Sequence, residues 1–356
     1  MALSPPIAAP LLKWYDRHQR RLPWRALKGE KPDPYAVWLS EVMLQQTTVA
    51  TVKGYFERFL QRWPTVQKLA AATEAEVLAE WAGLGYYSRG RNLHKAAKVI
   101  VHERQGQLPL NEAEWRALPG IGPYTAAAIS AIAHDQRANV VDGNVERVVA
   151  RLFAVSQPLP GAKAELTQLA ASLLPKRRFG DYAQALMDLG ATVCTPRAPG
   201  CDLCPLRAQC QAYALGTPQA FPKKTPKKQR PVRQASAFVL VNRQGEVWLR
   251  QRPERGLLAS MLEVPSSPWE AAPCALAEAL ASLDASRLPS ADRWQQAGEV
   301  RHVFTHFELR VTVYRAVCGQ KAPVGVWHTP DEAQKKALPT LMAKILACAG
   351  NDLAYP

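Results

Sequence analysis

The 356-residue sequence contains no apolar run long enough to cross a lipid bilayer, although 47% of its residues are hydrophobic. Its first residues, Met1–Pro6, lack the charged and apolar segments of a secretory signal. Cysteine is scarce, and the seven cysteines are an odd number of which four lie in one short stretch. This usage argues against a secreted protein held together by disulfides. We expect a cytoplasmic protein that does not associate with a membrane.

Acidic residues are too few to balance the basic ones. The chain has 45 Lys and Arg against 30 Asp and Glu, which gives a formal net charge of +15 at pH 7. An excess of this size predicts a polyanionic partner, either nucleic acid or an acidic membrane face. Because no membrane segment is present, we favour nucleic acid and expect a nucleoid-associated protein.

Patterns typical of β-strands are almost absent before residue 220. Apolar residues there recur at three- and four-residue spacing, as in 49–63, which predicts an all-α region over 1–220. Residues 221–233 are rich in Lys, Arg and Pro, and we interpret them as an extended basic linker. From residue 234 the pattern changes to short runs rich in Val, Phe and Trp with helical stretches between them. Residues 234–356 are therefore predicted to form an α+β domain.

Proline and glycine interrupt the helical pattern at Leu118-Pro119-Gly120-Ile121-Gly122. Asn111 and Glu114 have the spacing of a capping box at the start of the preceding helix, and the proline ends that helix. Gly120 and Gly122 allow the positive φ values and the close backbone approach that a tight turn needs. A glycine turn that opens onto a helix N-terminus presents N–H groups to an anion such as a DNA phosphate. An ordinary helix–turn–helix connection has the same pattern.

Four cysteines lie within seventeen residues, at Cys194, Cys201, Cys204 and Cys210. Structural zinc sites usually use two close pairs of ligands separated by a longer stretch, and this loop does not have that spacing. A single loop that supplies four thiolates is typical of an iron–sulfur cluster. Because thiolates suit either metal, ligand chemistry alone leaves both alternatives open.

Three separate segments together resemble the MutY-type adenine DNA glycosylases of the helix-hairpin-helix superfamily. They are the cysteine loop, Ser40-Glu41-Val42-Met43-Leu44-Gln45-Gln46-Thr47, and the hairpin followed by Val141-Asp142-Gly143-Asn144-Val145. The resemblance implies a multidomain protein with an all-α helix-hairpin-helix glycosylase region. Within it, 26–136 would form a six-helix domain, and 1–25 with 137–220 would form an iron–sulfur domain. The spacing of the four cysteines also resembles that of the 4Fe–4S loop in this superfamily, which favours that cofactor.

The resemblance implies a monofunctional enzyme of base excision repair. It would hydrolyse the N-glycosidic bond of adenine mispaired with 8-oxoguanine or guanine in double-stranded DNA, and we expect it to act as a monomer. Glu41 would donate a proton to the adenine, while an ionised Asp142 would stabilise the cation-like sugar, as two carboxyls do in glycoside hydrolysis. Tyr124 and Asn144 would orient Asp142 and a water molecule. Related lyases have a lysine nucleophile where this chain has Tyr124, and tyrosine cannot form a Schiff base.

The same resemblance implies a set of DNA-contacting residues. Gln46 and Tyr86 would enter the base stack. The flipped adenine would be surrounded by Trp24, Arg25, Leu44 and Gln184. Gly120 and Gly122 would hold a phosphate, and Thr305 and His306 would inspect the opposite base. Gln184 suits adenine because its amide offers both a donor and an acceptor. For Trp24, Leu44 and Tyr86 plain core packing is the alternative.

The C-terminal domain resembles the Nudix-like module of adenine glycosylases, most closely at 256–265. A Nudix hydrolase needs a helix with clustered Glu and Arg to bind Mg²⁺, whereas 268–283 contains only Glu270 and Glu278 and no Arg. We therefore expect a lesion-recognition module without hydrolase activity. Phe304-Thr305-His306 resembles the Phe-Ser-His loop that checks for 8-oxoguanine, although His306 can also be an ordinary histidine at the end of a strand.

Two other functions fit part of the pattern. An endonuclease III-like bifunctional pyrimidine glycosylase/lyase would share the hairpin and the cysteine loop, but Tyr124 and the additional domain argue against it. A non-catalytic DNA-binding protein would need only the hairpin and the positive charge. Glu41 and Asp142 argue against that second alternative.

Overall fold

The computed structural model describes residues 7–350, except 28, 227–228, 254–255, 260, 284–292, 319–324, 330–331 and 334–337. Contacts divide the chain into two units, Met1–Thr73 with Ser88–Lys227, and Glu74–Tyr87 with Lys228–Pro356. The domain boundaries expected at 25, 136, 220 and 233 stay a prediction. Parts of the predicted linker and of both terminal domains lie outside the described residues.

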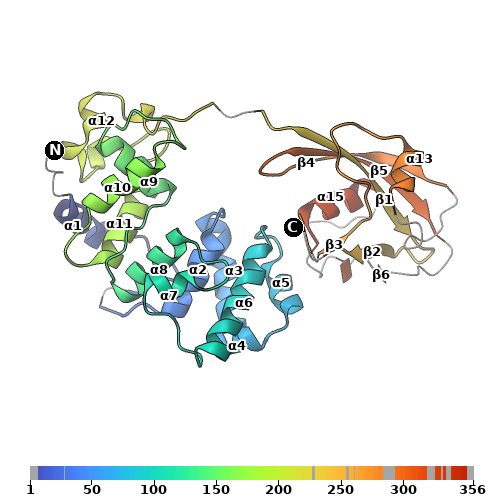
Figure 1. Ribbon diagram of the computed structural model, residues 1–356, viewed down its shortest axis with the longest axis horizontal. Coiled ribbons are helices and arrows are strands. Elements are labelled where there is room, and N and C mark those ends of the chain that lie inside the picture. Colours follow the sequence, from blue (N-terminus) through green and yellow to red (C-terminus); the bar gives the residue numbers. More distant parts are fainter. Residues whose placement is uncertain are drawn as a thin grey trace. The chain divides into compact units, whose positions relative to one another are not determined.

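The described residues of the first unit form helices joined by loops, which confirms the all-α prediction (Figure 1). The helices are α1 (Ala8–His18), α2 (Pro34–Leu44), α3 (Val49–Arg62), α4 (Val66–Ala71), α6 (Ser88–Glu103), α7 (Glu112–Arg116), α8 (Pro123–His134), α9 (Gly143–Leu152), α10 (Lys163–Ser172), α11 (Phe179–Thr192) and α12 (Gln211–Ala214). Short 3₁₀ turns occur at Cys201–Leu203, Arg207–Gln209 and Pro218–Ala220.

Three helices, α2, α8 and α11, form the centre of this unit. Every residue of α2 from Tyr35 to Met43 is buried, and so are most residues of α8 and α11. Helices that are apolar on all sides belong inside a protein, which explains why the sequence around Glu41 shows little polar periodicity. α8 packs against both α2 and α11, so residues distant in sequence meet in one region.

Two glycines allow α11 to approach its neighbours closely. A Cβ atom at Gly190 would lie 2.5 Å from the Cβ of Asn144, and one at Gly180 would lie 2.5 Å from the carbonyl oxygen of Ala131. Only glycine avoids these overlaps, because real Cβ contacts at such distances do not occur. The close approach at Gly190 places α11 directly against the start of α9.

The helix before the hairpin, α7, begins with half of the predicted capping box, since Asn111 is its N-cap but the Glu114 carboxyl accepts from Nδ2 of Asn111 and the backbone N–H of Leu110. The backbone N–H of Glu114 donates to Oδ1 of Asn111 at 3.0 Å. Gly120 has φ +76°, and a Cβ there would lie 2.5 Å from the Cβ of Asn92. The expectation of a positive φ was wrong for Gly122, which is the N-cap of α8 with φ −85° and has open space where a Cβ would be. An N-cap residue adopts extended backbone, which any residue can form.

The second unit contains α5 (Glu74–Trp81) and a mixed sheet. The strands are β1 (Val232–Val241), β2 (Val247–Gln251), β3 (Leu262–Glu263), β4 (Gln295–Val303), β5 (Glu308–Val317) and β6 (Val326–His328). Their order is β3-β2-β1-β5-β4, with β6 also paired to β2. The central strands β1 and β5 are parallel, and the other pairs are antiparallel.

Helices cover both faces of this sheet. α15 (Thr340–Cys348) packs on the face that includes Ala237 and Val239, and α13 (Leu276–Ala281) packs near Phe238 on the other face. Because successive side chains of a strand point to opposite faces, burial of all three residues means that β1 is covered on both sides. The predicted α+β domain is confirmed.

Candidate active site

Glu41 lies on α2 in the interior of the first unit, with only 6% of its surface exposed. Tyr124, in the first turn of α8, donates a hydrogen bond from its hydroxyl to Oε2 of Glu41 at 3.0 Å. The pKa of Glu41 is raised to about 7, mainly by burial and in part by the nearby carboxylate of Asp142, whereas Tyr124 and Arg25 oppose the rise. A carboxyl group in this environment keeps its proton at near-neutral pH.

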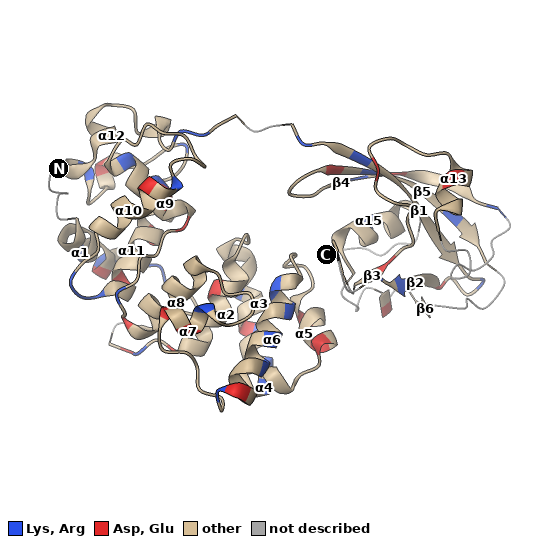
Figure 2. Ribbon diagram, viewed as in Figure 1, with Lys and Arg blue, Asp and Glu red and all other residues tan. Residues whose placement is uncertain are grey.

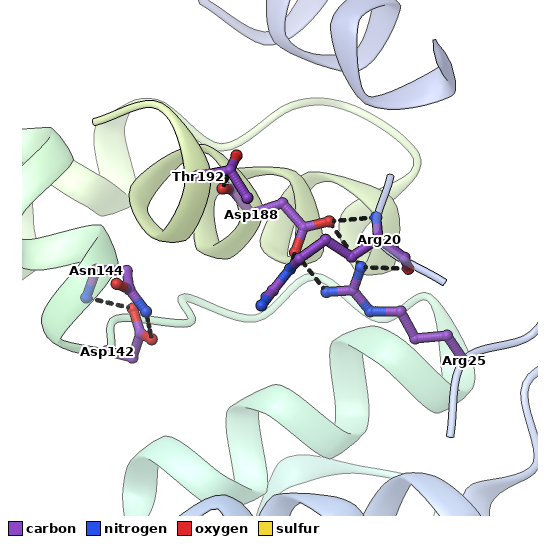
Figure 3. A network of polar contacts seen from close by, with 6 residues as sticks. All are labelled: Arg20, Arg25, Asp142, Asn144, Asp188 and Thr192. Carbon is purple, nitrogen blue, oxygen red and sulfur yellow. Dashed lines mark hydrogen bonds and ion pairs between the residues drawn. The ribbon is translucent and has the colours of Figure 1, made fainter. Parts of the chain in front are cut away.

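Asp142 is the N-cap of α9 and has a different environment. Its Oδ1 accepts hydrogen bonds from the backbone N–H groups of Asn144 at 2.9 Å and Val145 at 2.8 Å. Its Oδ2 accepts from Nδ2 of Asn144 at 2.8 Å, as Figure 3 shows. The carboxyl therefore accepts from three N–H donors at the N-terminus of a helix. Asp142 and Asn144 are thus held in one fixed arrangement at the start of α9.

Asn144 is in turn connected to the segment that precedes the cysteine loop. Arg147 donates from Nη2 to Oδ1 of Asn144 at 2.9 Å and to the carbonyl of Gly190 at 2.6 Å. The Nε of the same arginine donates to the carbonyl oxygen of Cys194 at 2.8 Å. One guanidinium therefore joins α9, α11 and the first cysteine.

A cavity of about 50 Å³ lies beside Glu41. All four residues expected around the flipped adenine line it, namely Trp24, Arg25, Leu44 and Gln184. Trp24 is 7% exposed and meets the Phe56 ring edge-on at 5.4 Å. Asp142 and Tyr124 do not line this cavity, but both interact electrostatically with Glu41. The structure thus brings together residues from four separate parts of the chain.

The wall of the cavity near Arg25 contains a buried ion-pair network (Figure 3). Asp188 on α11 accepts hydrogen bonds from Nη1 of Arg25 at 2.7 Å and from Nη2 at 2.8 Å. It also accepts from Nε of Arg20 at 2.7 Å and from the backbone N–H of Arg20 at 3.0 Å. The Asp188 side chain has no exposed surface. Neighbouring cationic groups hold the pKa of Asp188 below its usual range although burial opposes this.

The two residues expected to enter the base stack share an unusual backbone. Gln46 has φ +57° and Tyr86 has φ +46°, which is uncommon for residues other than glycine, and both are exposed. The guanidinium of Arg89 donates to the carbonyl oxygens of Met43 at 2.9 Å and Gln45 at 2.5 Å. It also donates to the hydroxyl of Thr47 at 3.1 Å, so a buried arginine fixes the turn that carries Gln46.

The four cysteines of the loop surround one small cavity. Cys194, Cys201, Cys204 and Cys210 line a space of about 20 Å³ together with Arg151, Arg207 and Tyr213. The pKa of the Cys204 thiol is raised to about 12, mainly by burial and in part by the other three cysteines, which lie nearby. Among the described residues, no three His, Cys, Asp or Glu side chains are grouped tightly enough to hold a metal ion. The loop therefore converges on a common centre but does not form a preassembled single-ion site.

Thr305 and His306 lie in the second unit, where they form the exposed tip of the hairpin between β4 and β5. The backbone N–H of Phe304 donates to the carbonyl of Phe307 at 2.9 Å. The ring of Phe304 stacks on Trp269, and the ring of Phe307 contacts both at a tilt. The aromatic cluster holds the base of the hairpin while its polar tip faces solvent. Within this same unit the hydroxyls of Tyr86 and Thr305 are 3.0 Å apart.

Comparison with known proteins agrees with this arrangement. Residues 39–175 match the family described as HhH-GPD superfamily base excision DNA repair protein, and residues 236–348 match the NUDIX domain family. The chain is 40% identical to the adenine DNA glycosylase of Mus musculus, over 94% of this chain and 76% of that protein. The chain belongs to the adenine DNA glycosylase family. The corresponding human enzyme is 38% identical over 94% of this chain and 72% of its own length.

A bacterial adenine DNA glycosylase aligns over most of its length. The enzyme of Buchnera aphidicola subsp. Schizaphis graminum is 31% identical, over 94% of this chain and 96% of its own length. Among solved structures, a thermostable thymine-DNA glycosylase superposes with a TM-score of 0.53 and 29% identity, over 58% of this chain and 95% of that protein. Membership of the adenine DNA glycosylase family makes the chain a base excision repair enzyme that hydrolyses an N-glycosyl bond, and DNA is its partner.

Two site residues were not anticipated from the sequence of this adenine DNA glycosylase. Asp188 and Arg147 were not singled out, because a charged residue in a helical pattern usually faces solvent. The apolar residues on both sides of Asp188 were the available signal, since they indicate a helix buried on all faces.

Lys and Arg occur on α6, on α9 and along the chain after α12 (Figure 2). In the described part of the chain, no helix combines the length and the apolar character needed to span a bilayer.

Proposed function

We propose that this chain is a monofunctional adenine DNA glycosylase with Glu41 as general acid and Asp142 as the stabilising carboxylate. The observation that carries the proposal is the position of Glu41. Its carboxyl lines the same cavity as Trp24, Arg25 and Gln184, and it accepts a hydrogen bond from the hydroxyl of Tyr124. A buried carboxyl with a pKa of about 7 can deliver a proton inside a pocket for a base.

The proposed reaction separates the roles of the two carboxyls. Adenine is a poor leaving group as an anion, so Glu41 protonates its N7 while the bond between C1′ and N9 breaks and adenine leaves neutral. The sugar becomes cation-like at C1′, and the carboxylate of Asp142 stabilises it. A water molecule then bonds to C1′ and releases a proton. Asn144 orients Asp142 through the 2.8 Å hydrogen bond. The hydroxyl of Tyr124 cannot form a Schiff base, so the strand stays intact.

The cavity must enlarge before a base can enter it, since about 50 Å³ is far below the 300 Å³ or more of usual ligand pockets. We propose that Trp24, Arg25, Leu44 and Gln184 surround the flipped adenine after this opening. Gln46 and Tyr86 fill the space that the base leaves in the duplex. The backbone at Gly120, which is exposed, and at Gly122, which is half-buried, is proposed to hold a DNA phosphate near the N-terminus of α8.

We propose that the four cysteines hold a 4Fe–4S cluster. The donor set fits, because four thiols from one loop line a common space and soft thiolates bind iron–sulfur clusters. When bound, such a cluster supplies covalent cross-links within the loop and a centre that can exchange electrons. The protein contributes Arg151, which is 1% exposed and donates to Sγ of Cys194 at 3.1 Å. We assign the group a structural role.

We propose adenine opposite 8-oxoguanine or guanine as the substrate, with Thr305 and His306 inspecting the opposite base. The hydroxyl and the imidazole are exposed at a hairpin tip, where they are available to a base edge. We also propose that the enzyme acts as a monomer, in the cytoplasm at the nucleoid. The net charge of +15 supports association with chromosomal DNA.

The decisive experiment uses a duplex with a single A:8-oxoguanine pair, single-turnover conditions and alkali treatment. We expect a break at the adenine position after alkali and none without it. Glu41→Gln and Asp142→Asn are each expected to lower the excision rate by about 100-fold or more, while affinity for the duplex remains. Glu57→Gln on the exposed surface of α3 is the control and keeps the wild-type rate. Near-wild-type rates in either active-site variant would contradict the proposal.

A further inference from the structure

A buried cation next to a general acid poses an electrostatic problem. Arg25 lines the same cavity as Glu41, its side chain is only 8% exposed, and its charge lowers the pKa of Glu41. An unpaired guanidinium in this position would favour the ionised form of Glu41. The acid would then form an ion pair with Arg25 and would have no proton to give.

The charged and titratable groups that face Glu41 come from four parts of the fold. Tyr124 comes from α8, Asp142 from the start of α9, and Arg25 from the loop before α2. Arg20, from the loop after α1, lines the same cavity. Two of these groups are cations, and the charge of Arg25 is the one that lowers the pKa of Glu41.

Asp188 is bound to both of these cations. Its carboxylate accepts hydrogen bonds from both terminal nitrogens of Arg25, at 2.7 and 2.8 Å, and from Nε of Arg20 at 2.7 Å. A bidentate pair fixes the plane of a guanidinium as well as its charge. With its side chain fully buried, Asp188 is shielded from water and its interaction with Arg25 is little screened.

We propose that Asp188 is a positioning residue for base excision, which keeps Glu41 protonated by neutralising Arg25 and holding its guanidinium at the cavity wall. The inference rests on the proposed roles of Glu41 and Arg25. Asp188 does not line the cavity and does not touch the base. It acts through Arg25, so its removal changes the pH at which the enzyme works as well as its rate.

The test is the pH dependence of single-turnover excision from an A:8-oxoguanine duplex. The wild-type rate falls as pH rises through about 7, because Glu41 loses its proton there. In Asp188→Asn the cation of Arg25 is unpaired, so this fall moves to lower pH by about one unit. The variant consequently loses most activity at about pH 8 and least at about pH 6.

A double-mutant cycle of Asp188 and Arg25 separates the shift of the pH midpoint from simple damage to the fold. Arg25→Gln leaves the Asp188 carboxylate partly unpaired, so the fall moves to higher pH, although the rate itself is reduced. In Asp188→Asn with Arg25→Gln both charges are gone, and the midpoint returns towards the wild-type value. If Asp188→Asn alone does not fold, the difference between Arg25→Gln and the double variant still measures the influence of Asp188. Circular dichroism and thermal unfolding establish which variants are folded.

Asp16→Asn is the matched control, since Asp16 pairs with Arg178 on the surface and is 42% exposed. It is expected to leave the midpoint unchanged. Either of two results would overturn the inference. The first is a wild-type midpoint in folded Asp188→Asn, and the second is equal midpoints in Arg25→Gln and the double variant.

Glu41→Gln distinguishes this inference from the proposed function. Normal excision in Glu41→Gln refutes the proposed function, whereas an inactive Glu41→Gln with an unmoved Asp188→Asn midpoint refutes only the role of Asp188.

Discussion

At the scale of single residues, the site consists of two carboxyls in opposite environments. Glu41 is buried and accepts a hydrogen bond from one hydroxyl, whereas Asp142 accepts three hydrogen bonds from N–H groups at a helix start. Burial favours the neutral form of Glu41. These two environments are the basis for proposing Glu41 as the general acid and Asp142 as the stabilising carboxylate.

Tyr124 is the residue through which this balance is best tested. Its hydroxyl donates to Glu41 and lowers the pKa of that carboxyl, so Tyr124→Phe raises the pKa of Glu41. Excision then persists to higher pH, with the alkaline fall displaced upward by about one unit or less. This shift is opposite in sign to the one expected for Asp188→Asn. The pH dependence of single-turnover excision measures both.

Tyr182→Phe is the control for loss of a buried hydroxyl. The Tyr182 hydroxyl is buried without a hydrogen-bond partner in the part of the chain that the structure describes. We expect this variant to keep the wild-type pH dependence. A Tyr124→Phe curve that coincides with the Tyr182→Phe curve would show that the hydroxyl of Tyr124 does not affect Glu41.

At the scale of elements, α9 links the active site to the cysteine loop. Its N-cap is Asp142, and two arginines one turn apart, Arg147 and Arg151, contact the loop at and after Cys194. Arg151 also donates to the carbonyl oxygens of Thr195 and Pro196. Loop and helix are consequently held as one piece, and the order of the loop affects the position of α9.

The prediction at the scale of elements concerns the iron–sulfur cluster that the cysteine loop is proposed to bind. Purified protein is expected to contain about four iron atoms per chain and to absorb visible light as iron–sulfur clusters do. Cys204→Ser removes one donor from the common space, so iron content and thermal stability both fall. Cys318→Ser, in the core of the second unit, leaves the iron content unchanged. Zinc in place of iron in the wild-type protein would support the alternative metal.

At the scale of the whole chain, the two units carry different parts of the proposed recognition. The first contains the cavity and both carboxyls, and the second contains the hairpin with Thr305 and His306. Neither unit alone contains all the groups that would read an adenine and its opposite base.

Truncation of the chain tests this division. A chain without residues 234–356 is expected to keep adenine excision but to lose much of its preference for A:8-oxoguanine over A:G. The ratio of the two single-turnover rates measures that preference. Thr305→Val with His306→Ala in the full chain is the milder variant, and it should lower the same ratio in the same direction. An unchanged ratio in both would refute the role of the hairpin.

The sequence was sufficient for the helices, the sheet domain and the residues around the cavity. Helix starts could be predicted because caps such as Asn111 act locally. Glu41 could be proposed as the general acid because its neighbours in sequence form a recognisable motif, and that role stays a prediction. The roles of Asp188 and Arg147 could not be predicted, since their hydrogen-bond partners Arg25 and Gly190 lie at distant positions in the chain. Gly122 was misjudged because the pattern of a glycine turn does not reveal which glycine has the positive φ.

The turn at Gln46 has a consequence for how the enzyme finds its target. Arg89 holds the carbonyl groups of this turn in place, and Gln46 has a positive φ that is uncommon for residues other than glycine. The entropy of ordering the turn backbone is therefore lost during folding. If Gln46 enters the base stack as proposed, this entropy is not lost again at each base pair that the enzyme samples.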